Sequence, residues 1–391
     1  MRLSPLSSLL PPSETLTVLE AVKELMSKGV DVVRFDVGEP DFDTPSFIKE
    51  AAKRALDEGH THYVQSRGIP ELRAAIAEHV KSELGISVDP EREVIVTPGA
   101  KFALLAAVMS LASAGDEVII LTPQWPTFKA CVMVAGARPV EVPVDLPYRL
   151  REEDLKEAIT PRTRAIMINT PNNPTGGVMP LEDLKAIADL AVDHDLAVIS
   201  DEIYRALVYG GRRHVSIATL PGMFERTVVV DGFSKTYAMT GWRLGWALGP
   251  REVIDAMVKI QQASTTHPTS FVQLAGVAAL RGPRSFVEEM VREYDRRRRA
   301  MVEALRRIEG VKCEEPEGAF YAFPDFSSLG LSSAELSRRL LTEAHVSSVP
   351  GGAFGRGGEG RLRLAYTVGV DRILEGVRRI GAFVERVRRG R

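Results

Sequence analysis

A regular alternation of apolar, strand-like runs with amphipathic, helix-like runs between residues 116 and 201 constrains the fold of this chain more than any other feature. Parallel strands need crossover connections, which are usually helices, so the alternation favours a mostly parallel sheet with helices on both faces. The sequence therefore predicts an α/β fold whose functional groups lie at the carboxyl ends of the strands. We expect strands at 117–121, 138–142, 164–169 and 197–200, with helices between them at 125–136, 152–159 and 181–192.

Length and composition argue against several classes of protein. A chain of 391 residues predicts two domains or one large unit with an appendage. Fifty lysines and arginines nearly balance 52 aspartates and glutamates, which argues against a nucleic-acid or anionic-membrane partner. The longest apolar stretch, 102–112, is shorter than the roughly 18 residues of a membrane span. The N-terminal segment lacks the continuous apolar core of a secretion signal. We expect Cys131 and Cys313 to be buried, and their spacing does not suit a metal site. The sequence therefore predicts a cytoplasmic enzyme that acts on a small molecule.

A lysine and an arginine bracket a short loop between two apolar runs. The run 227–230 predicts a strand that leads to Lys235, and Arg243 follows eight residues later, just before the apolar run 244–248. An amine and a guanidinium in such a loop suggest a nucleophile and a phosphate clamp. A solvated surface turn is the alternative interpretation.

A glycine turn leads into a helix at a second predicted junction. Gly99, Ala100 and Lys101 lie between a strand at 93–97 and a helix at 102–112. Free N–H groups and the positive end of the helix dipole make such a junction suitable for a phosphate. The alternative is a simple connection, because the pattern of a nucleotide-binding loop is missing.

Polar and aromatic residues follow three further strands. Trp125 comes after the strand at 117–121, Asn173 follows the strand at 164–169, and Asp201 and Tyr204 follow the strand at 197–200. An aspartate at a buried strand end is costly unless it is paired. The alternatives are a core position for the tryptophan, an ordinary turn for the asparagine and a helix cap for the aspartate.

The segment from Gly232 to Gly245 resembles the lysine signature of class I aminotransferases. The matching residues are Gly-Phe-Ser-Lys, Ala-Met and Gly-x-Arg-Leu-Gly, and the resemblance covers nearly the whole chain. It implies a fold type I enzyme in which Lys235 carries pyridoxal 5′-phosphate as a Schiff base. It also implies a large domain at 45–280 and a smaller α+β domain built from 1–44 and 281–391.

The same resemblance assigns roles around the cofactor ring. Lys235 would remove the Cα proton of the amino acid, and Asp201 would keep the ring nitrogen protonated. Asn173 and Tyr204 would contact the ring oxygen, and Trp125 would lie flat against the ring. The reaction implied is amino transfer from an L-amino acid to a 2-oxo acid in a ping-pong cycle.

Further roles concern the phosphate. The resemblance places it against Gly99, Ala100, Lys101 and Arg243, and it implies a homodimer in which Tyr63 reaches the phosphate of the neighbouring subunit. Some family members carry a serine three residues before the lysine, where this chain has Gly232. A phosphate contact by Ser234, next to the lysine, therefore stays open.

The substrate would lie between Gly38 and Arg363. By resemblance the backbone of Gly38 approaches the α-carboxylate, and Arg363 binds that carboxylate as a bidentate pair, with Arg361 as the next candidate. The residues alone also allow an exposed polar face for both arginines, because they alternate with leucines in a strand at 361–366. The arginine run at 296–299 is expected to form a solvated face.

We expect aspartate as the amino donor and 2-oxoglutarate as the acceptor. No arginine occurs between Arg251 and Arg281 to bind a second carboxylate, so Lys101 would take that place, although it also fits a phosphate contact or a surface position. Alanine, aromatic amino acids and prephenate are alternative substrates. A carbon–sulfur lyase of the same fold is a further alternative, and a regulator with a preceding DNA-binding domain is disfavoured because the aminotransferase pattern begins near residue 13.

Overall fold

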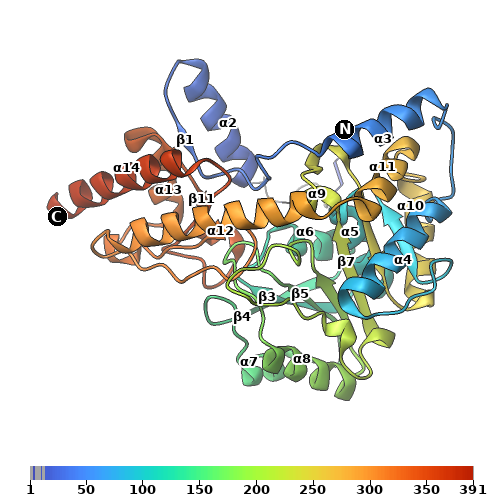
Figure 1. Ribbon diagram of the computed structural model, residues 1–391. Coiled ribbons are helices and arrows are strands. Elements are labelled where there is room, and N and C mark those ends of the chain that lie inside the picture. Colours follow the sequence, from blue (N-terminus) through green and yellow to red (C-terminus); the bar gives the residue numbers. More distant parts are fainter. Residues whose placement is uncertain (1–2, 5–9, 11–13, 391) are drawn as a thin grey trace.

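The protein is described by a computed structural model that covers residues 3–4, 10 and 14–390. The expectation about a secretion signal falls mostly outside these residues. The described part forms a seven-stranded mixed sheet with helices on both faces, and a second, smaller α+β region beside it (Figure 1). Within the described residues, no helix is both long enough and apolar enough to cross a membrane.

The large sheet confirms the predicted α/β architecture. Neighbouring strands are parallel except for β8, which is antiparallel to both β2 and β7. In spatial order the strands are β2 (Val94–Thr97), β8 (Gly245–Leu248), β7 (Thr227–Gly232), β6 (Ala197–Asp201), β5 (Thr163–Asn169), β3 (Glu117–Thr122) and β4 (Arg138–Pro143).

Alternate residues of these strands face opposite helix layers. Val228 and Val230 pack with the layer of α5 (Ala100–Leu111), α6 (Thr127–Val134) and α10 (Arg251–Ser264). Val229 packs on the other face, because side chains of a strand alternate in direction. That second layer consists of α3 (Ser46–Asp57), α4 (Pro70–Leu84) and α11 (Ser270–Arg281) over one end of the sheet, and α7 (Glu152–Ala158) and α8 (Leu181–Asp193) over the other.

The smaller region joins both ends of the described chain. Its sheets are β11–β12–β9 and the parallel pair β1–β10, so residues more than 300 positions apart pair directly. Its elements are α2 (Glu14–Ser27), β1 (Val33–Arg34), β9 (Tyr321–Ala322), α13 (Ser333–Ala344), β10 (Val346–Ser347), β11 (Val349–Pro350), β12 (Leu362–Ala365) and α14 (Val370–Arg389).

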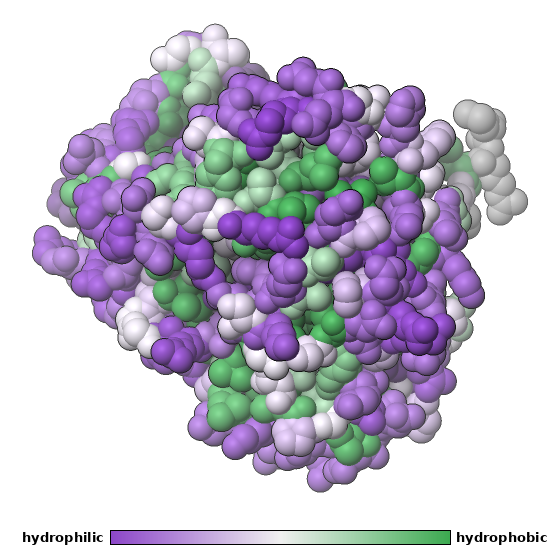
Figure 2. Space-filling model, turned by 45° about the vertical axis from the view of Figure 1, so that its right-hand side comes forward, coloured by the Kyte–Doolittle hydropathy of each residue, from purple (hydrophilic) through white to green (hydrophobic). Residues whose placement is uncertain are grey.

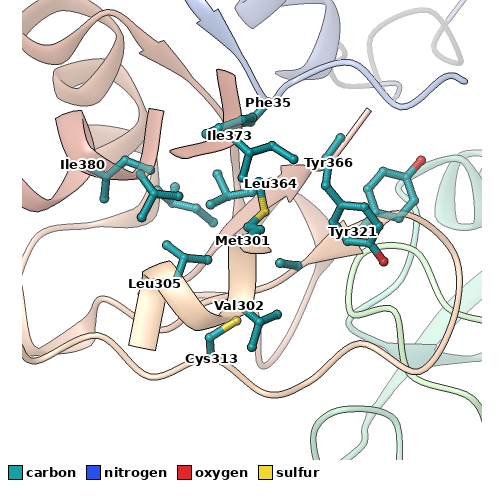
Figure 3. Close-up of a cluster of buried hydrophobic side chains, with 14 of the residues drawn as sticks. Phe35, Met301, Val302, Leu305, Cys313, Tyr321, Leu364, Tyr366, Ile373 and Ile380 are labelled. Atoms are coloured by element: carbon teal, nitrogen blue, oxygen red, sulfur yellow. The ribbon is translucent and has the colours of Figure 1, made fainter. Parts of the chain in front are cut away.

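The long helix α12 (Ser285–Arg306) runs between the two parts and packs against α14 (Figure 1). Met301 and Leu305 of this helix enter the apolar core of the smaller region, where Figure 3 shows them beside Leu364 and Ile373. The short helices are η1 (Ile217–Thr219), η2 (Phe224–Arg226), α9 (Phe233–Thr236), η3 (Thr240–Trp242), η4 (Ser327–Leu329) and η5 (Gly351–Phe354).

The arginine run at 296–299 is not a uniformly solvated face, so that prediction was wrong in part. Arg297 and Arg298 are buried and form ion pairs with Asp41 and Asp295 respectively. They lie on the side of α12 that packs inward, whereas the neighbours on either side of them point outward. Helical periodicity, rather than the charge run, therefore decides their environment.

Candidate active site

Strand ends from distant parts of the chain meet at one edge of the large sheet. Strands β3, β5, β6 and β7 are parallel, so their carboxyl ends share this edge and carry the predicted residues that follow them. The antiparallel strand β8 begins at the same edge, two residues after Arg243. The sheet thus explains why segments more than 100 residues apart supply one site.

Lys235 lies in α9, immediately after β7. Its Nζ donates a hydrogen bond to the carbonyl oxygen of Gly38 at 2.6 Å and lies 5.7 Å from the ring centroid of Phe320. Burial lowers the pKa of Lys235 to about 8, and the positive charges of Arg363 and Arg243 act in the same direction. The amine is therefore available as a nucleophile and base nearer neutral pH than an ordinary lysine.

Two side-chain contacts hold the segment after β1 over this lysine loop. Thr240 donates from Oγ1 to Glu39 Oε2 at 2.9 Å, and Trp242 donates from Nε1 to Thr44 Oγ1 at 3.1 Å. The first of these contacts involves the residue next to Gly38. The contacts therefore hold the Gly38 backbone beside the lysine amine, and the approach of this backbone to a substrate carboxylate stays a prediction.

Asp201 ends β6 as a buried carboxyl group. Its Oδ1 accepts a hydrogen bond from the backbone N–H of Ile203 at 3.1 Å. Burial raises the pKa of Asp201 to about 7, and the nearby carboxylates of Asp231 and Glu202 also raise it. No basic side chain among the described residues forms an ion pair with Asp201, so a cationic group placed against it would stabilise its charged form.

The start of α5 and the Arg243 side chain form a narrow cradle. Gly99 has φ +83°, and a Cβ built on it would lie 2.7 Å from Nη2 of Arg243. A Cβ on Gly245 would lie 2.5 Å from the backbone nitrogen of Ala100, so glycine is required at both places. No side chain among the described residues caps α5, which leaves its first N–H groups for an anion. The Arg243 guanidinium donates to the Thr240 carbonyl oxygen from Nη1 and keeps its charge for the same anion. Ser234 is buried in α9, and its contact to a phosphate stays a prediction.

Lys101 and Trp125 lie together at this junction. The Lys101 Nζ is 5.0 Å from the ring centroid of Trp125, and the lysine is exposed. The tryptophan is only half-buried, so it is not an ordinary core residue. The pair presents an aromatic surface with a cation beside it.

Arg363 contradicts the expectation of an exposed polar face. It is 3% exposed, because both faces of β12 are covered. Its Nη2 donates to the carbonyl oxygen of Asp36 at 2.7 Å and its Nη1 donates to Asn173 Oδ1 at 3.3 Å, whereas its Nε has no partner among the described residues. The guanidinium is therefore buried against neutral oxygens, with its charge left for an anionic ligand.

Arg361, the other clamp candidate, is engaged elsewhere. It forms ion pairs with Glu314 at 3.0 Å and Asp325 at 3.2 Å. With two carboxylates already bound, it has little charge to offer a substrate. Of the two arginines, Arg363 therefore has the geometry that better fits a carboxylate clamp.

Tyr204 lies in a turn that follows β6. Its hydroxyl is 2.9 Å from the hydroxyl of Tyr321, a buried residue of β9 that the sequence analysis did not single out. The pairing of Tyr321 with Ala365, two residues beyond Arg363, brings it to the site. Recognising that strand pairing would have been the available signal.

Tyr63 stands apart from the other predicted residues. It is 90% exposed, and it contacts the His267 ring edge-on at 5.6 Å. It lines a pocket of about 510 Å³ to which none of the other predicted site residues contributes.

Within the described residues, no group of three or more histidines, cysteines, aspartates or glutamates is arranged to hold a metal ion.

The remaining groups fit pyridoxal phosphate. The cofactor requires an amine for its aldehyde, a carboxylate for its ring nitrogen and a cationic cradle for its phosphate. Lys235 is a lysine with a lowered pKa, and Asp201 is a buried carboxyl group without a cationic partner. The glycine-lined junction completes the set, because it brings the first N–H groups of α5 close to the Arg243 guanidinium.

Comparison with known proteins agrees with this geometry. The family model for class I and II aminotransferases matches residues 30–380. An aspartate aminotransferase of Pyrococcus abyssi is 46% identical over 97% of both chains, and an aromatic-amino-acid aminotransferase of Thermococcus litoralis is 44% identical over the same shares. The structure of a Thermus thermophilus aspartate aminotransferase with maleate is 43% identical, with a TM-score of 0.93, and the match covers 98% of this chain and 100% of that one. The chain therefore belongs to the class I and II aminotransferases and is a pyridoxal-phosphate-dependent enzyme.

Proposed function

We propose that this aminotransferase uses aspartate as amino donor and 2-oxoglutarate as acceptor. The observation that carries the proposal is the position of Lys101, whose ammonium lies 5.0 Å from the Trp125 ring, in addition to the buried cation of Arg363. A dicarboxylic substrate needs a cation for each carboxylate. The names of the Pyrococcus and Thermus relatives, and the dicarboxylate maleate in the latter, support the same choice.

An aromatic donor is the second candidate. The half-buried Trp125 offers a surface on which an aromatic side chain could stack, and the Thermococcus litoralis relative is named for aromatic amino acids. The two candidates differ in what Lys101 does. An acidic side chain needs the lysine charge, whereas an aromatic side chain does not.

In this proposal Lys235 transfers the Cα proton, and Asp201 stabilises the positive charge on the ring nitrogen. Pyridoxal phosphate, when bound, acts as a sink for the electron pair left when a proton leaves Cα of the amino acid. The Lys235 amine takes that proton, because burial keeps its pKa near the working pH. With the cofactor bound, Asp201 would stay anionic and would keep the ring nitrogen protonated.

Arg363 and Asn173 orient the substrate and the ring. The Arg363 fork binds the α-carboxylate, with Asp36 and Asn173 holding the guanidinium in place. Because Asn173 accepts from Arg363 through Oδ1, its Nδ2 is left to donate to the ring oxygen. Tyr204 would donate to the same oxygen, and Trp125 would cover the ring face.

We also propose a cytoplasmic homodimer of two-domain subunits, divided into 45–280 and the combined segments 1–44 and 281–391. The 90% exposure of Tyr63 supports the dimer, since a phosphate role for this residue needs a second subunit. Figure 2 shows several groups of apolar side chains, separated by hydrophilic ones, on the face that it turns forward.

The test mixes a panel of amino donors with the yellow holoenzyme in single turnovers. The readout is the rate at which the absorbance of the lysine-bound cofactor is lost. Aspartate and glutamate should react faster than alanine and phenylalanine. Lys101→Ala should slow the acidic donors alone, by roughly tenfold or more if one charged contact of about 1.5–3 kcal/mol is lost. Lys129→Ala, which removes an exposed lysine paired with Glu141, is the matched control.

If Lys101→Ala slowed all donors equally, Lys101 would be assigned to the phosphate, and the acidic substrate would lose its support. Phenylalanine reacting faster than aspartate would favour the aromatic candidate. Release of pyruvate and ammonia without an oxo-acid acceptor would identify a lyase instead.

A further inference from the structure

Tyr321 connects three parts of the site and has no role in the mechanism described so far. It belongs to β9, which pairs with β12 in the smaller region, and it is 1% exposed. Its hydroxyl lies 2.9 Å from the Tyr204 hydroxyl, which follows β6 of the large sheet. Its ring centroid lies 4.7 Å from the guanidinium carbon of Arg363.

We propose that Tyr321 is a positioning residue that orients the Tyr204 hydroxyl toward the cofactor and holds the Arg363 guanidinium for the substrate carboxylate. This inference rests on the roles proposed above for Tyr204 and Arg363. It assigns two separable functions to one side chain, one to the hydroxyl and one to the ring.

The hydroxyl function follows from counting protons. A tyrosine hydroxyl has one proton to donate and lone pairs to accept. If Tyr204 donates its proton to the ring oxygen of the cofactor, its oxygen can only accept from Tyr321. Burial also raises the pKa of Tyr321, so its phenol keeps the proton that it must donate. The chain of two hydroxyls then strengthens the donation to the ring oxygen.

Gly38 fixes where the Tyr321 hydroxyl can lie. A Cβ built on Gly38 would be 2.6 Å from that hydroxyl oxygen, so the glycine backbone packs directly against it. The same Gly38 accepts a hydrogen bond from Lys235 through its carbonyl oxygen. The tyrosine hydroxyl therefore has little freedom to turn away from Tyr204.

The ring function concerns the substrate cation. The Arg363 guanidinium lies near two aromatic rings, that of Tyr321 at 4.7 Å and that of Phe354 at 5.5 Å. Cation–π contact with these rings limits the positions that the planar fork can adopt. Loss of the Tyr321 ring should therefore weaken carboxylate binding, whereas loss of its hydroxyl alone should not.

A purely structural role is the competing explanation, because Tyr321 is also part of the buried cluster drawn in Figure 3. Tyr366 provides a matched control within that cluster. It is fully buried directly after the end of β12, and its hydroxyl donates to the carbonyl oxygen of Ala319 rather than to a site residue. Tyr366→Phe should affect thermal stability and neither site property.

The first experiment measures the pH midpoint of the absorption change of the lysine-bound cofactor. Deprotonation leaves negative charge on the ring oxygen, so a hydroxyl that donates to this oxygen lowers the midpoint. Tyr321→Phe should raise it by about half to one pH unit, as expected for losing one hydrogen bond. In a Tyr204→Phe background the same substitution should cause no further shift, because the two hydroxyls act as one unit.

The second experiment measures the dissociation constant of maleate, a dicarboxylate probe. Tyr321→Phe should leave it within about twofold, and Tyr321→Leu should raise it roughly fivefold or more as the cation–π contact is lost. A wild-type midpoint in Tyr321→Phe would overturn the hydroxyl role, as would an equal shift in Tyr366→Phe. Unchanged maleate binding in Tyr321→Leu would overturn the ring role. Failure of the wild-type protein to bind the cofactor or transfer an amino group would instead refute the proposed function itself.

Discussion

Replacement of Arg363 by alanine should remove most of the catalytic efficiency while the cofactor stays bound. The guanidinium is 3% exposed, and its described hydrogen-bond partners, the carbonyl of Asp36 and the amide of Asn173, are neutral. Truncating one side of a buried, charged hydrogen-bonded pair typically costs about 2–5 kcal/mol. At about 1.4 kcal/mol per factor of ten, kcat/KM should fall roughly 30-fold to several-thousand-fold.

The assay compares kcat, KM and bound cofactor in Arg363→Ala, Arg363→Lys and Arg361→Ala. Arg363→Lys should recover only part of the loss, since an ammonium keeps the charge but cannot form the planar fork. Arg361→Ala breaks the pairs with Glu314 and Asp325, so it should lower the melting temperature and leave KM nearly unchanged. A kcat/KM in Arg363→Ala within about threefold of wild type, or an equal loss in Arg361→Ala, would refute the assignment of the clamp.

Three further outcomes are expected. Mixed dimers of Lys235→Ala and Tyr63→Ala subunits should regain about half of the wild-type activity per dimer, since one of their two sites then has both Lys235 and Tyr63. Mixed dimers no more active than the Tyr63→Ala parent would argue against a role of Tyr63 across subunits. The rate at which the cofactor-free protein takes up pyridoxal phosphate should rise with pH around a midpoint near 8, because only the unprotonated Lys235 amine attacks; a midpoint near 10.5 would contradict a lowered pKa. In the cofactor-free protein, the free energy of unfolding should fall as pH rises from about 4 to about 7. Asp201 should account for up to about 4 kcal/mol of this fall, because the folded state keeps a proton that the unfolded chain, with an Asp pKa of 3.8, releases. Asp201→Asn should lack that part of the pH dependence in denaturant titrations.

Much of the large sheet could be predicted because its signals are local. The runs that became β3 and β5 each contain a continuous apolar stretch, 118–121 and 165–168 respectively, which is typical of strands buried on both faces. Parallel order then places Asp201, Asn173 and Lys235 at one edge without knowledge of any long-range contact. These residues could be singled out from strand ends and spacing alone, although their roles came from the family resemblance.

The smaller region was harder to predict because its order depends on pairing between distant segments. The runs 318–323 and 32–37 are both strand-like, so the sequence predicts a strand in each. The structure has only Tyr321–Ala322 and Val33–Arg34 there. The burial of Arg363 likewise depends on what covers both faces of β12, which alternation along a short strand does not reveal. Tyr321 was missed for the same reason, since its contacts with Tyr204 and Gly38 join segments far apart in the chain.

Covalent binding of pyridoxal phosphate by Lys235 can be measured by borohydride reduction of the holoenzyme followed by peptide mapping. Reduction fixes the cofactor to the nitrogen that carries it, so we expect one modified peptide, containing Lys235, and a Lys235→Ala variant that yields none. Lys101 provides an internal comparison, because it is the other lysine at the proposed site and is exposed. Label on Lys101 or any other lysine, or a colourless protein that takes up no cofactor, would contradict the account.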